Sequence, residues 1–266
     1  MTRLNEDHYR GAAIGWAHGA TLTYAPIAAV LIARTPIPLM GARVLDVGAG
    51  TGVCEAPLRA AGTATVIAAD LSHDMLAWNR PARPPAVVAE AMRLPFPDAV
   101  FDVAVASFVL NHLVDPVGGL AELARVIRPG GAVLATVYAN SSRSANRDTV
   151  DGIARTHGWV PPTWYTELKA TATPLLGTSD SMSAAATAAA LIDITVDEEP
   201  VDVGLTEPQA LVVYRFGQAH FAEWLSEFSL AERAAVRSAA VHAIESAMEP
   251  FRPRVVFLTA RTAPRK

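Results

Sequence analysis

The chain has 266 residues, 51% of them hydrophobic, and a formal net charge of −4, which suffices to bury one sizeable core. We therefore expect one domain over residues 1–266, and the absence of a Lys/Arg run argues against a nucleic-acid partner. The lone Cys54 excludes an intramolecular disulfide, and no apolar run is expected to reach transmembrane length or to form a signal peptide. These features predict a soluble cytoplasmic protein without a membrane partner.

Short Val-rich apolar runs alternate with helical patterns through the first half of the chain. Each run suits a strand that is buried on both faces. Strands that alternate with helices predict an α/β fold with a mostly parallel sheet and a ligand at the C-terminal strand ends. The expected strands are 43–47, 65–69, 86–89, 101–106 and 132–138, and the expected helices are 52–61, 73–79 and 117–127.

Three segments flank this core. The first has aromatic residues in an Ala-rich helical pattern and is expected to form a lid, with Gly11, Gly15 and Gly19 as hinges. The second has a polar opening, a Pro-aromatic cluster and a helix, and is large enough to wall an acceptor pocket. The segments are residues 5–33, 140–191 and 193–261 around a core at 41–138, and the last is expected to hold strands at 193–203 and 254–261 with helices over 206–248.

The stretch VLDVGAGTGVCEA, residues 44–56, predicts a buried strand, a tight glycine turn and a helix N-terminus close to a ligand. A dinucleotide fingerprint has glycines at its first, third and sixth positions, whereas Gly48, Gly50 and Gly52 are followed by Val53 at the sixth. The loop therefore does not favour a nicotinamide cofactor.

Asp46 lies near the end of this strand, two residues before the first glycine. Burying its carboxylate costs several kcal/mol unless a partner compensates, and the α-amino group of a ligand would be such a partner, directly or through water. The alternative is an aspartate that only accepts backbone hydrogen bonds in the turn. A pyrophosphate would be repelled by this acid.

Two further strand ends indicate a nucleoside. Asp70 closes the second strand, where a carboxylate can accept both ribose hydroxyls, although the same residue can also begin the next helix. Glu90, Ala91 and Met92 follow the third strand, where a side-chain acceptor and a backbone N–H can meet an adenine edge.

Four motifs in this order, VLDVGAGTG, AADLS, EAMRLPFPDAVFDVAVAS and ELARVIRPGG, resemble the class I S-adenosylmethionine-dependent methyltransferases, in particular the branch of ubiquinone, menaquinone and natural-product tailoring enzymes. The resemblance implies a Rossmann-like, doubly wound seven-stranded sheet with an antiparallel last strand. It also implies S-adenosylmethionine as cofactor and S-adenosylhomocysteine as product. The implied cofactor residues are Asp46, Gly48, Ala49 and Gly50 at the methionine part, Asp70 at the ribose, Leu71, Ala91 and Met92 at the adenine, and Ser107 beside the cofactor.

Methyl transfer from a sulfonium needs alignment, desolvation and, for a hydroxyl or ammonium acceptor, loss of a proton, but no metal. His112 follows the fourth strand, where similar O-methyltransferases carry a base, and is the first catalytic candidate. The alternative for His112 is a packing or capping role. His157, in the insertion, is the second catalytic candidate, and its alternative is a plain surface or packing histidine. Asn140 stands where relatives place an acid after the fifth strand.

Aromatic residues concentrate in the two expected lids. Core packing explains some of them, but their placement predicts a small-molecule acceptor with an apolar, aromatic or isoprenoid-like body, and a homo-oligomer is a further candidate partner. The residues assigned to the acceptor are Trp16, Tyr24, Trp164 and Tyr165.

The predicted function is methyl transfer to a small metabolite in secondary metabolism, on oxygen, nitrogen or carbon. Enzymes of this fold also couple methylation to a cyclisation or rearrangement, or replace it with one, and stoichiometric S-adenosylhomocysteine formation distinguishes these cases. A cofactor-binding protein without catalysis is disfavoured because the set of binding glycines and acids is complete.

Overall fold

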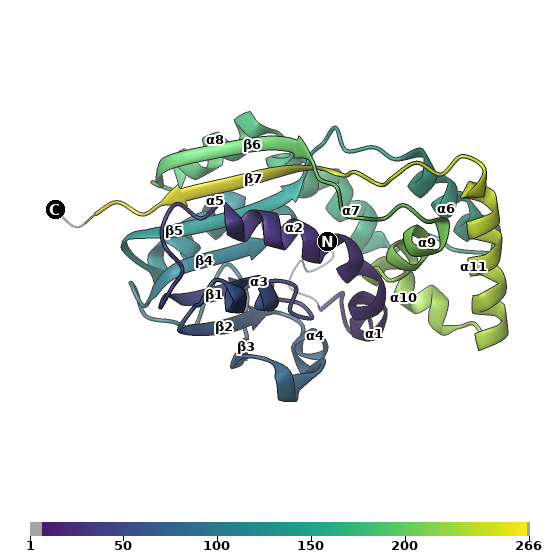
Figure 1. Cartoon of the computed structure of the whole chain (residues 1–266), viewed down its shortest axis with the longest axis horizontal. Coiled ribbons are helices and arrows are strands. Elements are labelled where there is room, and N and C mark those ends of the chain that lie inside the picture. Colours follow the sequence, from purple (N-terminus) through teal and green to yellow (C-terminus); the bar gives the residue numbers. More distant parts are fainter. Residues whose placement is uncertain (1–6, 265–266) are drawn as a thin grey trace.

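The computed structural model describes residues 7–264, so residues 5 and 6 of the expected lid lie outside the described part. Seven strands form one sheet in the order β3-β2-β1-β4-β5-β7-β6 (Figure 1). The pairs among β1 to β5 are parallel, and β7 is antiparallel to both of its neighbours. This architecture confirms the predicted Rossmann-like fold. The strands are β1 Arg43–Val47, β2 Thr65–Asp70, β3 Ala86–Val88, β4 Phe101–Ser107, β5 Ile127–Tyr138, β6 Ile192–Pro200 and β7 Arg254–Arg261.

Helices cover both faces of the sheet, and a further group of helices extends beyond the C-terminal strand ends (Figure 1). The first flanking segment forms α1 Ala13–Gly15, the π-helix η1 Trp16–Ala20 and α2 Thr21–Ala33. The core holds α3 Glu55–Ala60, α4 His73–Ala77 and α5 Pro116–Val126, with the short turns η2 Arg80–Ala82 and η3 Leu110–His112. The remainder forms α6 Ala145–Thr156, α7 Thr163–Thr171, η4 Thr173–Leu176, α8 Ser179–Ala188, α9 Pro208–Phe216, α10 Ala219–Ser226 and α11 Leu230–Glu245.

Local chemistry sets these boundaries. Asp115 accepts the N–H of Gly118 at 2.8 Å and thereby caps α5. The expected helical region 206–248 divides into three helices, the last of which begins with the capping box of Ser229 and Glu232. Strand β5 begins five residues earlier than expected, because Ile127 pairs with Phe101 before a register shift.

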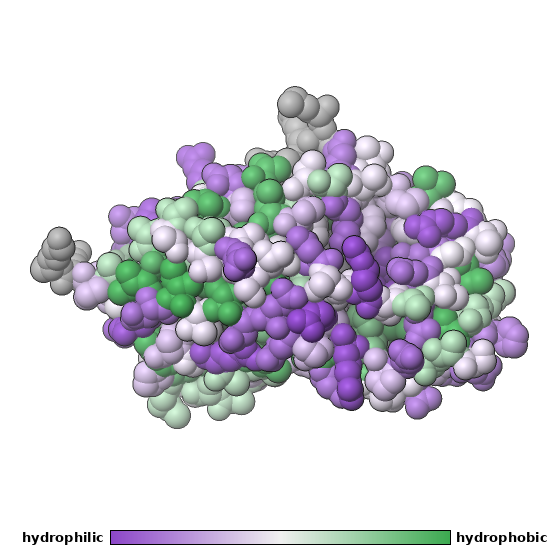
Figure 2. Space-filling model, turned by 90° about the horizontal axis from the view of Figure 1, so that it is seen from above, coloured by the Kyte–Doolittle hydropathy of each residue, from purple (hydrophilic) through white to green (hydrophobic). Residues whose placement is uncertain are grey.

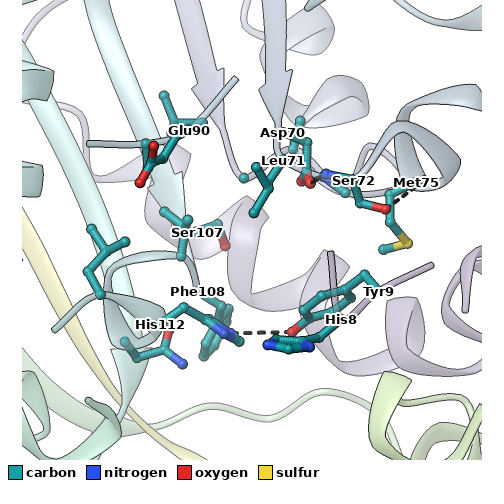
Figure 3. A pocket seen from close by; sticks show the side chains of 18 of the residues that line it. His8, Tyr9, Asp70, Leu71, Ser72, Met75, Glu90, Ser107, Phe108 and His112 are labelled. Carbon is teal, nitrogen blue, oxygen red and sulfur yellow. Dashed lines mark hydrogen bonds between the residues drawn. The ribbon is translucent and has the colours of Figure 1, made fainter. Parts of the chain in front are cut away.

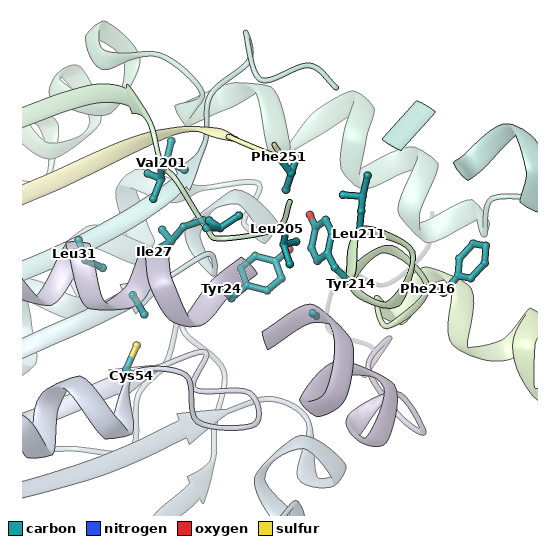
Figure 4. Packing of buried hydrophobic residues seen from close by; sticks show 14 of the residues in the cluster. Tyr24, Ile27, Leu31, Cys54, Val201, Leu205, Leu211, Tyr214, Phe216 and Phe251 are labelled. Carbon is teal, nitrogen blue, oxygen red and sulfur yellow. The ribbon is translucent and has the colours of Figure 1, made fainter. Parts of the chain in front are cut away.

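Helix α2 packs in one of the two main core clusters, where Ile27 and Tyr24 lie near Tyr214 of α9 (Figure 4). Gly19 allows this approach, because a Cβ added to it would overlap the carbonyl oxygen of Val213 in α9. Gly15 also lies near Gly217, where an added Cβ would make only ordinary contacts. Close helix packing therefore accounts for Gly19, and the hinge motion expected of Gly11, Gly15 and Gly19 stays a prediction.

The helical run Ala13–Ala33 also contradicts the expectation that no apolar run reaches transmembrane length. It has 21 residues, and its most apolar window of 18 residues has a mean hydropathy of 1.3, which is long and apolar enough to cross a bilayer. In the structure 44% of its most apolar window is buried, with Ile27, Leu31 and Ile32 in the core. Packing against the protein's own core thus accounts for much of its apolar character.

Strand β6 forms one edge of the sheet and carries a row of acidic residues. Figure 2 looks down onto this side of the molecule, where hydrophilic residues form bands and hydrophobic residues gather in small groups. Arg34 of α2 donates to Asp197 at 2.9 Å, and Arg254 of β7 donates to Glu198 at 3.2 Å. Charges on an edge strand oppose pairing with a further strand.

Candidate cofactor and acceptor site

A cavity of about 300 Å³ lies at the C-terminal ends of the parallel strands. The strand order reverses between β1 and β4, and open α/β sheets bind ligands at such a reversal. The loops after β1 to β4, the end of β5, the N-terminal segment and α7 line it. Figure 3 shows Tyr9 of the N-terminal segment beside His112 in this cavity. The cavity therefore lies where the alternation of strands and helices predicts a ligand.

Hydrogen bonds to two side chains fix the backbone of the glycine loop after β1. Gly50 has φ of +53°, and its N–H donates to Asp70 Oδ2 at 2.7 Å. The buried guanidinium of Arg83 donates to the Gly50 carbonyl at 2.8 Å and to Glu55 at 2.7 Å. Arg83 has no motif around it that would reveal this role in the sequence, and the sequence reasoning did not include it.

Asp70 lines the cavity with its carboxylate fixed by backbone donors. It accepts the N–H of Gly50 and the N–H of Ser72, the latter at 2.8 Å (Figure 3). Ser72 rather than Asp70 caps α4, because the Ser72 hydroxyl accepts the N–H of Met75. Burial raises the pKa of Asp70 above its usual value, and the two N–H donors partly offset this effect. Its remaining lone pairs can accept ribose hydroxyls.

We expect Asp70→Ala to weaken S-adenosylhomocysteine binding by roughly 2 kcal/mol, because two hydrogen bonds to a charged acceptor are lost. Calorimetric titration measures the change. Asp180→Ala removes an exposed carboxylate of α8 that does not line the cavity and should leave the affinity unchanged. Equal affinities for the Asp70 variant and the unmodified protein would remove Asp70 from the binding site.

Asp46 is buried at 1% exposure, and neither of its carboxylate oxygens has a hydrogen-bond partner within residues 7–264. The structure thus does not show the alternative role, in which it accepts backbone hydrogen bonds in the turn. Burial raises its pKa to about 7, although the neighbouring Cys54 thiol acts in the opposite direction. Asp46 is not among the residues that line the cavity, so an α-amino group would reach it through water or after a shift of the loop.

The remaining predicted cofactor residues, Gly48, Ala49, Leu71, Ala91, Met92 and Ser107, all line the cavity. The Ser107 hydroxyl is buried without a partner in the described chain, so it is free to bind a ligand. Among residues 7–264 no Lys or Arg lines this cavity, and its charge suits the sulfonium and ammonium groups of S-adenosylmethionine. Its lining carboxylates are Asp7, Asp70, Glu90, Asp115 and Glu167.

His112 lies in the same cavity and pairs with Tyr9, whose hydroxyl is 3.3 Å from His112 Nε2 (Figure 3). Burial lowers the pKa of His112 to about 4, so the imidazole is neutral at physiological pH. Burial raises the pKa of Tyr9, so its phenol stays protonated. The sequence reasoning placed Tyr9 in the lid without assigning it to the site.

Aromatic side chains form one connected cluster in the lining of the cavity. Trp16 stacks on Tyr24 with ring centroids 5.0 Å apart, and Trp164 stacks on His8 at 4.9 Å. Phe108, which packs against Tyr24, has φ of +59°, a conformation that a bulky residue adopts only where surrounding structure enforces it. The structure thus brings three predicted acceptor residues, Trp16, Tyr24 and Trp164, to one wall.

Two predicted residues lie elsewhere. Tyr165 lines a smaller adjoining cavity, where it stacks on His220 at 3.9 Å. His157 is exposed at the end of α6 and lines neither cavity, and its Nδ1 contacts the carbonyl oxygen of Ile153 at 2.9 Å. The structure therefore does not bring His157 to the cavity that holds His112.

The core of the chain is the part most similar in sequence to known proteins. Residues 45–135 match the family described as "Methyltransferase domain". Demethylmenaquinone methyltransferase of Mycobacterium sp. (strain KMS) is 45% identical over 105 residues, which are 40% of this chain and 45% of the relative. The enzyme of that name from Clavibacter sepedonicus is 44% identical over 110 residues, 40% of this chain and 44% of the relative. The chain thus matches less than half the length of these curated relatives.

Solved structures share the fold over most of the chain. The [4+2]-cyclase SpnF covers 91% of this chain and 82% of its own, with a TM-score of 0.55 and 22% identity. The match to phosphoethanolamine N-methyltransferase 2 of Haemonchus contortus, solved with S-adenosyl-L-methionine, covers 89% of this chain and 52% of that protein, with a TM-score of 0.57 and 19% identity. The match to a Haloferax volcanii putative methyltransferase covers 99% of this chain and 98% of that protein, with a TM-score of 0.61 and 17% identity.

The sheet order and the glycine loop are similar to those of the class I S-adenosylmethionine-dependent methyltransferases, and the match to the methyltransferase-domain family covers this same part of the chain. Within this class, residues 45–135 match the methyltransferase-domain family, and the core of the chain is similar in sequence to the demethylmenaquinone methyltransferases.

Proposed function

We propose that the chain transfers the methyl group of S-adenosylmethionine to a small metabolite with an apolar or aromatic body, in secondary metabolism. One observation carries this proposal: a single cavity combines a glycine loop and carboxylates with aromatic rings and a neutral histidine. The glycine loop and the carboxylates suit a cationic nucleoside–amino acid, and the rings suit an apolar acceptor.

In this proposal the loop from Gly48 to Gly50 and the Asp70 carboxylate hold the cofactor, which supplies an electrophilic methyl group when bound. Trp16, Tyr24 and Trp164 align the acceptor and exclude water from it. Neutral His112 accepts a hydrogen bond from an acceptor hydroxyl and takes its proton during transfer.

Two contacts support a role for the N-terminal segment as a cover over this site. The Ser72 hydroxyl donates to Asp7 at 3.1 Å, and the N–H of Gly11 donates to Asp74 at the same distance. Both contacts tie the segment to the region around α4, on the cofactor side of the cavity. The cover would hold the reacting groups away from water.

A cyclisation or rearrangement is the second candidate, since the same fold carries a protein named as a [4+2]-cyclase. The experiment that separates the candidates supplies methyl-labelled S-adenosylmethionine with a panel of phenols, amines and prenylated quinols. Methyl transfer predicts labelled product and S-adenosylhomocysteine in equal amounts. A product formed without S-adenosylhomocysteine would contradict the proposed function.

A further inference from the structure

A second, smaller cavity adjoins the acceptor side of the first, and we call it the annexe. Its volume is about 80 Å³, and it lies between α6, α7, α9 and α10. The two cavities share eight wall residues, of which six have rings: Tyr9, Trp16, Tyr24, His112, Tyr138 and Trp164, with Asn111 and Leu168 as the other two. A ligand packed against these rings can therefore extend one end into the annexe.

The annexe has the opposite charge character to the main cavity. Arg147, Lys169 and Arg215 line it, whereas no Asp or Glu among residues 7–264 does. Arg215 is neutralised by Asp151, to which it donates twice at 2.6 Å and 2.7 Å. Two cations of the annexe wall therefore remain without a carboxylate beside them.

Arg147 is the more enclosed of these two cations. It lies on α6, makes no ion pair within the described chain, and its Nε atom is buried without a hydrogen-bond partner. Lys169 also makes no ion pair there and reaches the annexe from an exposed position on α7. A buried guanidinium N–H without an acceptor is costly, so Arg147 Nε can take an acceptor atom from a ligand.

Neutral groups of the annexe are also without partners. The Thr173 hydroxyl and His220 Nε2 are both buried and make no hydrogen bond within residues 7–264. His220 is only 5% exposed, and burial beside Arg215 and Arg147 lowers its pKa, so it is neutral. These groups can complete the hydrogen bonding of an oxygen anion that the guanidinium attracts.

We infer that the annexe binds a carboxylate of the acceptor, so that the substrate class is small organic acids with an apolar or aromatic body. The carboxylate would accept from Arg147 and Thr173, the body would lie along Trp16 and Trp164, and the methylated atom would face the cofactor. This inference rests on the proposed function, because it assigns the far end of the same acceptor.

The test is a calorimetric titration of the full chain saturated with S-adenosylhomocysteine, using two probes of equal shape. 3-Phenylpropanoate carries a carboxylate, and 3-phenylpropanamide replaces it with a neutral amide. We expect the acid to bind at least about tenfold more tightly than the amide, because it gains a charged hydrogen bond. Arg147→Gln should remove that preference and leave the amide affinity unchanged.

Matched variants keep the test specific to the annexe. Arg147→Lys retains the charge and should keep part of the preference, whereas Arg237→Gln removes an exposed arginine of α11 and should change nothing. Equal binding of acid and amide, no binding of either, or an Arg147→Gln protein with the full preference would overturn the inference. Tighter binding of benzyl phosphate than of the acid would overturn its assignment to a carboxylate.

The same titrations separate the two proposals. If S-adenosylhomocysteine itself fails to bind, the proposed function fails before any acid is added. If it binds and the acid shows no preference, only the annexe assignment fails.

Discussion

Gly50→Val is expected to weaken S-adenosylhomocysteine binding by at least about a hundredfold. Gly50 has φ of +53°, a conformation that a β-branched residue adopts only with strain of about 1–3 kcal/mol. A Cβ at this position would already lie 3.4 Å from Met75 Cε and 3.8 Å from Trp16 Nε1. The two methyl groups beyond it would then occupy the space between these cavity residues, where the cofactor must approach the backbone.

The matched control is Gly41→Val. Gly41 also has a positive φ, of +73°, but a Cβ there meets no atom within 4 Å. This variant should lower the melting temperature through the same backbone strain and retain its affinity for S-adenosylhomocysteine. Calorimetry measures the affinity of both variants, and thermal unfolding measures their stability. A Gly50→Val protein that binds as well as the Gly41→Val protein would place the cofactor elsewhere.

His112→Ala is the second large effect. For a hydroxyl acceptor we expect turnover to fall by about a hundredfold or more, while S-adenosylhomocysteine affinity stays nearly intact. Because the pKa of His112 is lowered to about 4, the imidazole is in its base form throughout the neutral range. The unmodified enzyme should therefore lose activity through this group only as the pH falls toward 4, and not near 6.5.

The pH profile of the variant identifies the role of the imidazole. Without the base, the rate should rise with pH as the acceptor ionises by itself, near pH 10 for a phenol. His157→Ala removes an exposed histidine outside the site and should leave turnover unchanged. Tyr9→Phe keeps the ring beside His112 and removes only its hydroxyl partner, so it should cost less than His112→Ala.

Two other results would assign His112 differently. A small loss of turnover that is independent of pH would indicate a carbon or a neutral amine as the methylated atom. A large loss of S-adenosylhomocysteine affinity would indicate that the imidazole only supports the turn after β4.

The sequence predicts the sheet well because its strands carry a local signal. Runs such as VLDV and FDVAVA are apolar on both faces, and the positions from Gly48 to Gly52 need a turn that only glycine makes readily. The predicted ends of a strand are less accurate where pairing with a neighbouring strand, and not local composition, sets them. Strand β5 extends back to Ile127 because of a partner residue in β4, which no local pattern reveals.

The acceptor side depends on contacts between residues far apart in the chain. Tyr9 and His112 are 103 residues apart in sequence, and their pairing follows from where the N-terminal segment crosses the cavity. Arg147 stands in the polar stretch NSSRSANRD, which has the composition of a surface loop, yet α6 carries its side chain to the annexe. Hydrophobic periodicity contains no information about such contacts, and for this reason the annexe was absent from the sequence-based site.

The most direct test of the account is a pair of calorimetric titrations of the purified chain, one with S-adenosylhomocysteine and one with NAD. The glycine spacing, Asp70 and the carboxylate-lined cavity predict one site for S-adenosylhomocysteine at micromolar strength and no heat from NAD. Binding of NAD with no response to S-adenosylhomocysteine would contradict the account.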